Sequence, residues 1–195
     1  MKNSPARGAP RFLACRLRCL LAIAAMAGLI TAPGLAGAIE VKPVAFVDLQ
    51  RYAGKWYEIA RLPNRFQADC VGDVSATYTP QEEGRIQVVN RCRKQDNSID
   101  EAQGIAHVVD PSTNAKLEVR FAPAWLSWLP LVWGDYWIID LAPDYSVAAV
   151  GEPKREWLWI LSRKPELDDA AYQALLDRLA AQGFDTAQLR KTTHK

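Results

Sequence analysis

Two alternating segments and the turn between them read Val74-Ser75-Ala76-Thr77-Tyr78-Thr79, then Pro80-Gln81-Glu82-Glu83-Gly84, then Arg85-Ile86-Gln87-Val88-Val89-Asn90. In both segments, apolar and polar side chains alternate, which is typical of a β-strand with one buried and one wet face. The turn contains Pro and Gly, which hairpin connections favour. This stretch therefore predicts an antiparallel β-hairpin.

Similar segments, each bounded by turn residues, follow one another along the chain. The short links between them make consecutive strands antiparallel neighbours, and closing the sheet removes exposed edges. The sequence therefore predicts an all-β fold, an eight-stranded antiparallel up-and-down β-barrel. The predicted strands are 54–62, 72–79, 85–93, 101–110, 115–122, 135–142, 145–151 and 156–163.

One α-helix is predicted after the last strand. Asp168 or Asp169 can cap its start, and Gly183 supplies its end. Its apolar residues recur at the spacing of one helix face, which we expect to pack on the outside of the barrel. The residues from Lys191 to Lys195 are expected to form a frayed tail. The apolar stripe consists of Tyr172, Leu175, Leu176 and Leu179.

Residues 1–38 have the order of a secretory signal peptide. Basic residues come first, the apolar run 20–30 follows, and the segment ends in Ala36-Gly37-Ala38. The run is shorter than the roughly 20 residues that span a bilayer. We therefore predict cleavage after Ala38, which leaves about 157 residues, enough for one domain over 39–195.

Cleavage also changes the charge of the chain. The signal carries five of the 24 basic residues and none of the 22 acidic ones. The remainder has a net charge of about −3, which offers no basic excess to attract a nucleic-acid backbone. Nucleic acid is therefore excluded as an expected partner.

Two cysteines remain after Cys15 and Cys19 leave with the signal. Cys70 and Cys92 form an even pair in an exported chain, for which a disulfide is the default interpretation. A constant pairing across the 80–84 turn, with Ala76 opposite Ile86, would place both cysteines on one face.

The barrel interior allows two interpretations. An eight-stranded barrel is just wide enough to hold one small ligand or to be filled by its own side chains. Small inward residues such as Ala60, Gly104, Ala106 and Ala149 favour a ligand. Large neighbouring side chains remain the alternative.

The Gly54-x-Trp56 motif, the strand at 135–140, the terminal Arg163 and the following helix together resemble the lipocalin family, and most closely its bacterial branch, the Blc-like lipocalins related to apolipoprotein D. The resemblance covers nearly all of 39–195. It implies that Trp56 closes the bottom of the barrel and that Arg163 packs across its indole, a cation–π contact.

The resemblance also orients the barrel. It places hairpins 80–84, 111–114 and 142–144 at the closed bottom, and segments 63–71, 94–100, 123–134 and 152–155 around the mouth. Cys70 and Cys92 then brace the rim.

Alternation and the resemblance together predict the residues that line the cup. Asn90, Tyr78 and Tyr136 would place a few polar groups in an apolar wall, which suits an amphiphile with a chain and a head group. Glu58 also points inward, as a paired carboxylate or, alternatively, a catalytic acid. The predicted ligand-binding residues are Val74, Ala76, Tyr78, Val88, Asn90, Ala106, Val108, Val119, Phe121, Tyr136, Ile138, Ala149, Trp157 and Trp159.

The rim segment 123–133 is unusually apolar and carries no charge. An exposed apolar run marks an interaction site. Three interpretations stay open: a lid over the cup, a homodimer interface, or contact with a membrane surface, where Trp is favoured. The residues that would make this contact are Trp125, Leu126, Trp128, Leu129 and Trp133.

The sequence predicts a binding protein rather than an enzyme. After cleavage only His107 and His194 remain, the first on the outer face and the second in the tail, so no histidine-based catalytic group forms inside. No metal-ligand spacing is present, and no cofactor is expected. The predicted function is storage or transport of a fatty acid, lysophospholipid or similar amphiphile for envelope maintenance. The alternatives are a lipid-modifying enzyme using Cys70 or Cys92 and a protein-interaction module using the rim.

Bacterial lipocalins typically carry an acylated cysteine at the signal cleavage point. The matching stretch here, Leu35-Ala36-Gly37-Ala38-Ile39, has none. We therefore expect an exported protein, periplasmic or secreted, that touches the outer membrane reversibly through 123–133.

Overall fold

The computed structural model describes residues 39–195; the predicted signal peptide, residues 1–38, lies outside the described residues. The elements run in the order α1 (Leu49–Tyr52), β1 (Gly54–Arg61), η1 (Arg65–Gln67), β2 (Cys70–Pro80), η2 (Glu82–Gly84), β3 (Arg85–Lys94), β4 (Ile99–Val108), β5 (Lys116–Arg120), η3 (Ala124–Leu126), η4 (Pro130–Val132), β6 (Gly134–Leu141), β7 (Val147–Gly151), β8 (Leu158–Ser162), α2 (Asp169–Ala181), η5 (Thr186–Gln188) and β9 (Arg190–Lys191).

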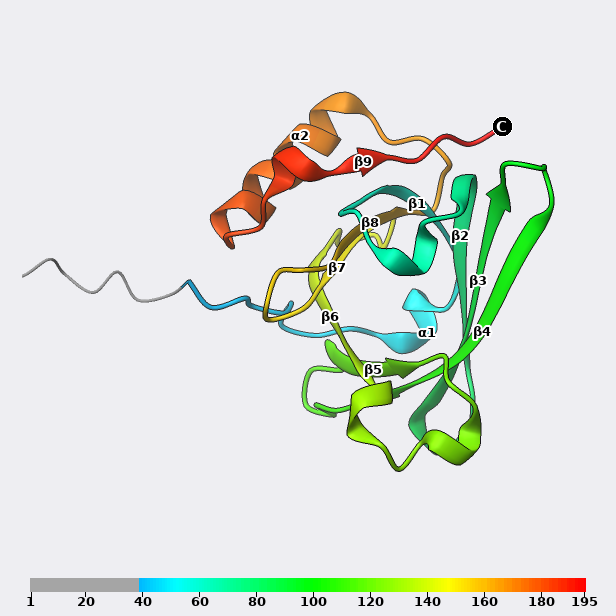
Figure 1. Ribbon diagram of the computed structural model, residues 1–195. Helices are drawn as coiled ribbons and strands as arrows, with labels where there is room; N and C mark the ends of the chain where they lie inside the picture. Colours follow the sequence, from blue (N-terminus) through cyan, green and yellow to red (C-terminus); the bar gives the residue numbers. More distant parts are fainter. Residues whose placement is uncertain (1–38) are drawn as a thin grey trace, which may run out of the picture. The chain divides into compact units, whose positions relative to one another are not determined.

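Strands β1 to β8 form one closed antiparallel sheet (Figure 1). Each strand pairs with the next along the chain, and β1 closes the ring because it pairs with β2 on one side and with β8 on the other. The alternation seen in the sequence places Val74, Ala76 and Tyr78 in the buried interior. The predicted eight-stranded up-and-down barrel is confirmed.

Helix α2 covers the outside of the barrel, as predicted. It begins at Asp169 because the Asp168 side chain accepts hydrogen bonds from the backbone N–H groups of Ala170 and Ala171. Neither helix of the described residues is long and apolar enough to cross a membrane. The apolar cluster between α2 and the sheet includes Ile59, Ala60, Ile139, Ala149, Leu158, Ile160, Tyr172, Leu175, Leu179 and Phe184.

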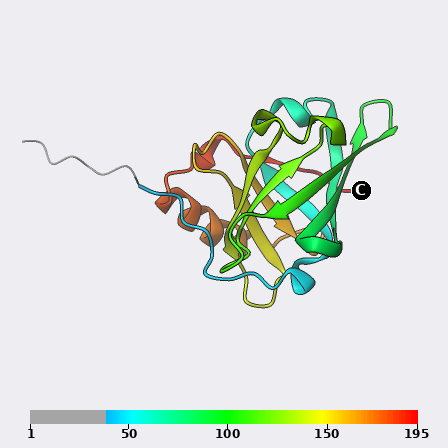
Figure 2. The ribbon, with the colours of Figure 1, turned by 90° about the horizontal axis from the view of Figure 1, so that it is seen from below.

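Different segments lie at the two ends of the barrel (Figure 2). At one end lie α1, η2 and the turn between β6 and β7. At the opposite end lie η1, the turn between β3 and β4, and the segment that contains η3 and η4. The orientation implied by the sequence resemblance therefore agrees with the structure.

The predicted register of the β2–β3 hairpin is wrong. Ala76 lies opposite Asn90, and Ile86 lies opposite Pro80. The pairing is centred on Glu83, two residues later than the predicted register, and Gln81 donates a backbone hydrogen bond to the carbonyl of Arg85. Two irregularities between Cys70 and Ser75 shift the pairing again near the rim.

Strands β7 and β8 begin two residues later than predicted, at 147 and 158, because carboxylates shape the preceding turns. Asp144 accepts hydrogen bonds from the backbone and the hydroxyl of Ser146. Glu152, which is 4% exposed, accepts from the backbone N–H groups of Lys154, Glu156 and Trp157. Residues 145–146 and 156–157, which were predicted as strand, therefore belong to turns that these two carboxylates stabilise.

The prediction of a frayed tail is also wrong. Arg190 and Lys191 form β9, which pairs with Arg61 and Ala60 of β1. The chain then bridges toward β2, because the Thr193 carbonyl accepts from the N–H of Asp73 and the N–H of Lys195 donates to the Asp73 carboxylate. The tail therefore links two strands that do not pair with each other at this level.

Candidate ligand site

Trp56 closes the barrel at its lower end. Its side chain is fully buried, and its indole N–H donates to the carbonyl of Tyr52 over 2.8 Å. The guanidinium carbon of Arg163 lies 3.9 Å from the centre of the Trp56 ring, in the arrangement that the sequence resemblance implied. Gly54 has a positive φ of 92°, and a Cβ there would lie 3.5 Å from the Arg163 side chain.

Arg163 also ties the chain around this end of the barrel. Its side chain donates to the carbonyls of Arg51 (2.7 Å), Ala53 (2.9 Å) and Lys55 (2.8 Å). These carbonyls belong to the segment that runs from α1 into β1. One arginine thus holds both α1 and Trp56 in place.

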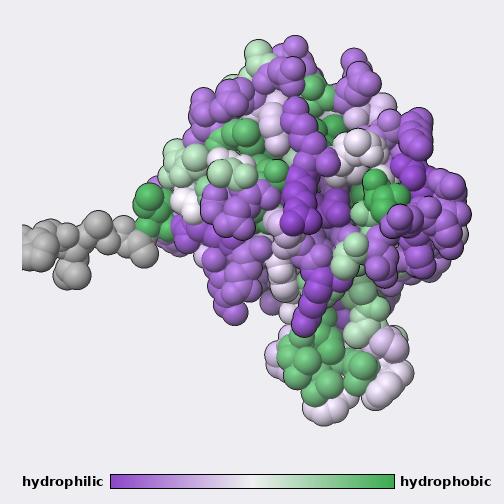
Figure 3. All heavy atoms as spheres, turned by 45° about the horizontal axis from the view of Figure 1, so that its top comes forward, coloured by the Kyte–Doolittle hydropathy of each residue, from purple (hydrophilic) through white to green (hydrophobic). Residues whose placement is uncertain are grey.

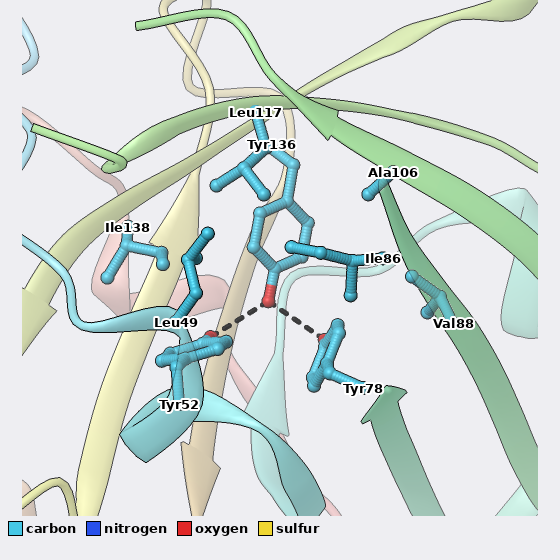
Figure 4. Close-up of a pocket in the computed structure, with 9 residues that line it drawn as sticks. All are labelled: Leu49, Tyr52, Tyr78, Ile86, Val88, Ala106, Leu117, Tyr136 and Ile138. Carbon is cyan, nitrogen blue, oxygen red and sulfur yellow. Dashed lines mark hydrogen bonds between the residues drawn. The ribbon is translucent and has the colours of Figure 1, made fainter. Parts of the chain in front are cut away.

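Tyr52, Tyr78 and Tyr136 meet inside the barrel and form a layer, the tyrosine floor (Figure 4); the rings of Tyr52 and Trp56 lie 4.9 Å apart. The hydroxyls of Tyr52 and Tyr136 lie 2.9 Å apart, and the Tyr136 hydroxyl donates to Tyr78 over 2.8 Å. Burial raises the pKa of Tyr78 to about 12, and it raises the pKa values of Tyr52 and Tyr136 well above the usual range. The three phenols therefore remain neutral and hold one another at physiological pH.

Little space remains between these tyrosines and the aliphatic side chains around them. The cavity has a volume of about 10 Å³, space for about one water molecule. The alternative in which large side chains fill the barrel therefore applies to its lower half. The cavity is lined by Leu49, Tyr52, Tyr78, Ile86, Val88, Ala106, Leu117, Tyr136 and Ile138.

The inward face of β4 becomes more exposed toward the mouth. Ala102 and Gly104 share the inward face of β4 with the buried Ala106, yet Ala102 is exposed and Gly104 is half-buried. Phe121 is 43% exposed at the end of β5. A Cβ on Gly104 would lie 2.8 Å from the Phe121 ring, so the ring covers β4 where only glycine fits. Inward side chains thus change from buried to solvent-exposed toward the mouth.

The predicted ligand-binding residues divide between these levels. The apolar cluster of the lower barrel contains or contacts Ala76, Tyr78, Val88, Ala106, Val108, Val119, Tyr136, Ile138 and Trp159. Val74 is buried on the same face of β2 as Ala76. Asn90, Phe121 and Trp157 are half-buried or exposed toward the mouth.

The prediction that Ala149 lines the cup is wrong. Ala149 packs in the outer cluster beneath α2, while Ala148 and Val150 belong to the interior cluster. Strand β7 is apolar on both faces because a helix covers the outside, so alternation could not show which face points inward.

The predicted polar groups of the wall have different roles from those expected. The Tyr136 hydroxyl forms hydrogen bonds with those of Tyr78 and Tyr52. Tyr78 and Tyr136 are therefore part of the tyrosine floor and do not point toward a ligand head group. Tyr52 was not predicted from the sequence, because α1 is a single turn outside the predicted strands.

A polar cluster around Glu58 lies above the floor. The Glu58 carboxylate accepts from Arg61 (2.6 Å), from the Gln67 amide (2.6 Å) and from the hydroxyl of Thr192. The Gln67 amide oxygen accepts from the Trp159 indole over 2.9 Å. Glu58 is therefore the paired carboxylate that the sequence favoured, although its partners belong to the mouth side of β1.

Arg61 and Gln67 are site residues that alternation did not identify. The register between β1 and β8 shifts between Glu58 and Ala60, so Ile59 and Ala60 both pack outward and Arg61 shares the inward side with Glu58. A bulge of this kind leaves no mark in a hydrophobicity pattern.

The rim is braced by a disulfide between Cys70 and Cys92, whose Cα atoms lie 5.6 Å apart. The predicted bond is confirmed. These two sulfurs are therefore committed to the bond, and the thiol chemistry considered above has no free Cys70 or Cys92 thiol. No group of three or more metal-binding side chains lies together within residues 39–195.

The apolar rim segment projects beside β5 and outside the ring of strands (Figures 1 and 3). Trp133 contacts the outer face, with its ring 4.6 Å from His107 and 5.2 Å from the Arg120 guanidinium. Trp125, Trp128 and Leu131 are 73%, 74% and 83% exposed, while Leu126 and Leu129 are half-buried. In this conformation the segment is not a lid over the cup.

Comparison with known proteins identifies the same architecture. The model of the "Lipocalin-like domain" family matches residues 47–194. Temperature-induced lipocalin-1 of Arabidopsis thaliana is 39% identical over 155 residues, which cover 78% of this chain and 82% of that protein. The outer membrane lipoprotein Blc of Vibrio cholerae is 35% identical over 152 residues, covering 77% and 84%. Insecticyanin of Manduca sexta superimposes with a TM-score of 0.61 at 19% identity, covering 80% and 85% of the two chains.

Proposed function

The chain belongs to the lipocalin family, whose members bind small hydrophobic ligands, and from this premise we propose that it carries a lipid in the upper half of its barrel. The gradient of exposure along the inward face carries the proposal. Apolar side chains such as Phe121 and Trp157 stay half-buried or exposed toward the mouth, above the tyrosines that close the lower barrel. Burying them against an acyl chain would be favourable by about 25 cal/mol per Å² of apolar area.

The proposed ligand is an amphiphile with one acyl chain, such as a fatty acid or a lysophospholipid. The chain would lie on the tyrosine floor, because the space below it is filled. Its polar end would face the mouth, where Asn90, Arg61 and Gln67 supply hydrogen-bonding groups and the Glu58–Arg61 pair is 2.6 Å long. A short open cup with a polar upper edge suits this class of molecule.

We propose a carrier and not an enzyme. Glu58, the buried carboxylate nearest the cup, already accepts from three side chains, and Cys70 is bonded to Cys92. His107 lies on the outer face beside Glu118, at 3.6 Å. The nucleophile and base that catalysis needs in mutual reach are therefore not assembled by these residues.

Titration of the delipidated protein with oleate and with a lysophospholipid, followed by tryptophan fluorescence, tests the carrier. The proposed ligand would lie beside Trp157 and Trp159, so saturable quenching or a spectral shift is expected. Ala102→Phe would place a ring in the open half without touching the tyrosine floor, and it should abolish the change. Thr79→Phe, an exposed position on the outer face of β2, is the matched control. Equal binding by both variants would contradict the proposed position of the ligand.

We further propose that residues 1–38 direct export and are removed after Ala38, so that the carrier acts in the periplasm or outside the cell in envelope lipid maintenance. The V. cholerae relative, an outer membrane lipoprotein by name, supports an envelope location. N-terminal sequencing of the protein recovered from its native host should begin at Ile39. An uncleaved N-terminus would refute this part of the proposal.

A second candidate is contact with a membrane surface through residues 123–133. The observation that favours it is the exposure of Trp125, Trp128 and Leu131 on an uncharged projection (Figure 3). Flotation with phosphatidylcholine vesicles should recover the wild type and lose the Trp125→Ser/Trp128→Ser variant. If the wild type does not float and this variant instead converts a dimer to a monomer in sedimentation equilibrium, the projection is a homodimer interface.

A further inference from the structure

A polar groove lies on the outer face of the barrel, separate from the cup. It has a volume of about 440 Å³ and lies where β3, β4 and β5 meet the segment after β5. Gln87 pairs with Ile105 and Ile105 with Arg120, and these positions alternate with the inward residues Val88, Ala106 and Val119. The polar side chains that line the groove are Gln81, Arg85, Gln87, Gln103 and Arg120.

Arg120 is the unusual member of this set. It is only 8% exposed, and its Nε is the one buried side-chain nitrogen or oxygen in residues 39–195 without a hydrogen-bond partner. Its Nη1 donates to the carbonyl of Ala122, and its guanidinium lies 5.2 Å from the Trp133 ring. A buried guanidinium with an unpartnered Nε is costly, and an anion in the groove, which Arg120 lines, would compensate its charge.

Arg85 adds a second cation from the other side of the groove. Its one ion pair, with Glu83 at 3.1 Å, joins side chains that are 54% and 78% exposed. Such a pair contributes little, so Arg85 can turn to a ligand at small cost. Within the described residues that line the groove there is no Asp or Glu; the Glu118 carboxylate nearby pairs with His107, and Glu101 accepts from Gln103.

We propose that this groove is a second ligand site, which binds a phosphate group. Two guanidinium groups offer forked donors that match phosphate oxygens, and the glutamine amides add neutral donors around them. Ala122 and Ala124 form one edge of the groove and lead directly into the apolar projection. The phosphate can therefore come from a phospholipid head group at a membrane surface or from a soluble phosphate ester.

The test measures binding of sn-glycerol 3-phosphate by calorimetry, and flotation with phosphatidylcholine vesicles with and without phosphatidylglycerol. Arg120→Gln and Arg85→Gln each remove one cation, and Arg85→Gln is the variant whose fold is safe because the side chain is largely exposed. Arg91→Gln is the matched control: it removes an exposed arginine from the outer face of β3 that pairs with Glu101 and does not line the groove.

Each groove variant should weaken binding of the phosphate ligand about tenfold, the effect of one charge-assisted hydrogen bond, while Arg91→Gln leaves it unchanged. Oleate binding in the cup should be the same in wild type and Arg85→Gln, so failure of the carrier proposal does not affect this result. Selective loss of anionic-vesicle flotation identifies the head group as the source, and loss of glycerol phosphate binding alone identifies a soluble ester. The proposal is overturned if neither ligand binds or if Arg91→Gln weakens binding as much as Arg85→Gln.

Discussion

At the scale of single residues, the lower barrel depends on polar groups that satisfy one another. Tyr52, Tyr78 and Tyr136 meet in an apolar interior where each hydroxyl needs a partner. Arg163 donates hydrogen bonds to carbonyls of the α1–β1 segment, and its guanidinium also stacks on the Trp56 ring. Substitutions at these residues should therefore change the free energy of unfolding more than they change the affinity for a ligand.

The raised pKa of Tyr78, about 12, predicts loss of stability at alkaline pH. Below the ordinary value near 10, the phenol is neutral in both the folded and the unfolded chain, so pH has no effect through this group. Between about pH 10 and 12 only the unfolded chain ionises, so the free energy of unfolding falls by about 1.4 kcal/mol per pH unit for this tyrosine. Denaturant unfolding between pH 8 and 11 should show a shallower fall above pH 10 for Tyr78→Phe than for the wild type. Identical slopes would contradict the assignment.

Arg163→Lys should lower the free energy of unfolding by about 2–4 kcal/mol, because a lysine cannot serve several carbonyls and the indole face together. Urea denaturation followed by far-UV circular dichroism measures the change. Arg190→Lys, the same replacement at an exposed position of β9, is the control and should have little effect. Equal stability of the two variants would show that the Arg163 contacts are dispensable.

At the scale of elements, hydrophobic periodicity predicted the strands and the helix that are buried on one face. It did not predict features set by burial on two faces or by backbone pairing. The eight strands and α2 follow from alternation, turn residues and the stripe headed by Tyr172. Strand β7 is buried on both faces, so its inward residues could not be assigned, and Ala149 was placed wrongly. The bulge that turns Arg61 inward and the pairing of Arg190–Lys191 with β1 depend on backbone contacts between distant segments, which a sequence pattern does not record.

The docked tail gives an element-scale prediction. Thr192→Val removes the hydroxyl that donates to the buried Glu58 and should lower the free energy of unfolding by about 1–3 kcal/mol. Thr193→Val makes the same chemical change one residue later, at an exposed side chain, and should be nearly neutral. Hydrogen exchange of the Ile59–Arg61 segment should accelerate in the first variant only. Similar exchange in both variants would show that the hydroxyl does not hold the tail.

At the scale of the whole molecule, the lower half of the barrel is packed with side chains, and inward residues nearer the mouth are more exposed. The lower half supplies the packed core, whereas Phe121 and Ala102 above it stay accessible to solvent. The proposed ligand site would therefore be a shallow cup above the packed lower half, with a polar upper edge from β1 and η1. The sequence predicted a cup, but the depth of the proposed cup depends on how three tyrosines pack, which alternation does not record.

A ligand that occupies this cup only in the folded state should stabilise the whole barrel. At a free concentration 100 times its dissociation constant, oleate or a lysophospholipid should raise the free energy of unfolding by about 2.7 kcal/mol. Thermal unfolding with and without ligand measures the shift, and Ala102→Phe should show none. A shift of equal size in that variant would place the ligand elsewhere on the molecule.

The docked tail also bears on the order of events in synthesis. Thr192 reaches Glu58 across a sequence separation of 134 residues, so β1 leaves the ribosome long before its last partners exist. Until then the upper part of β1 has unpaired backbone groups, and contacts of such long range form slowly. The upper edge of β1 therefore lacks its last partner until the final residues emerge, which would suit the proposed export, since an exported chain is threaded through a translocation channel before it folds.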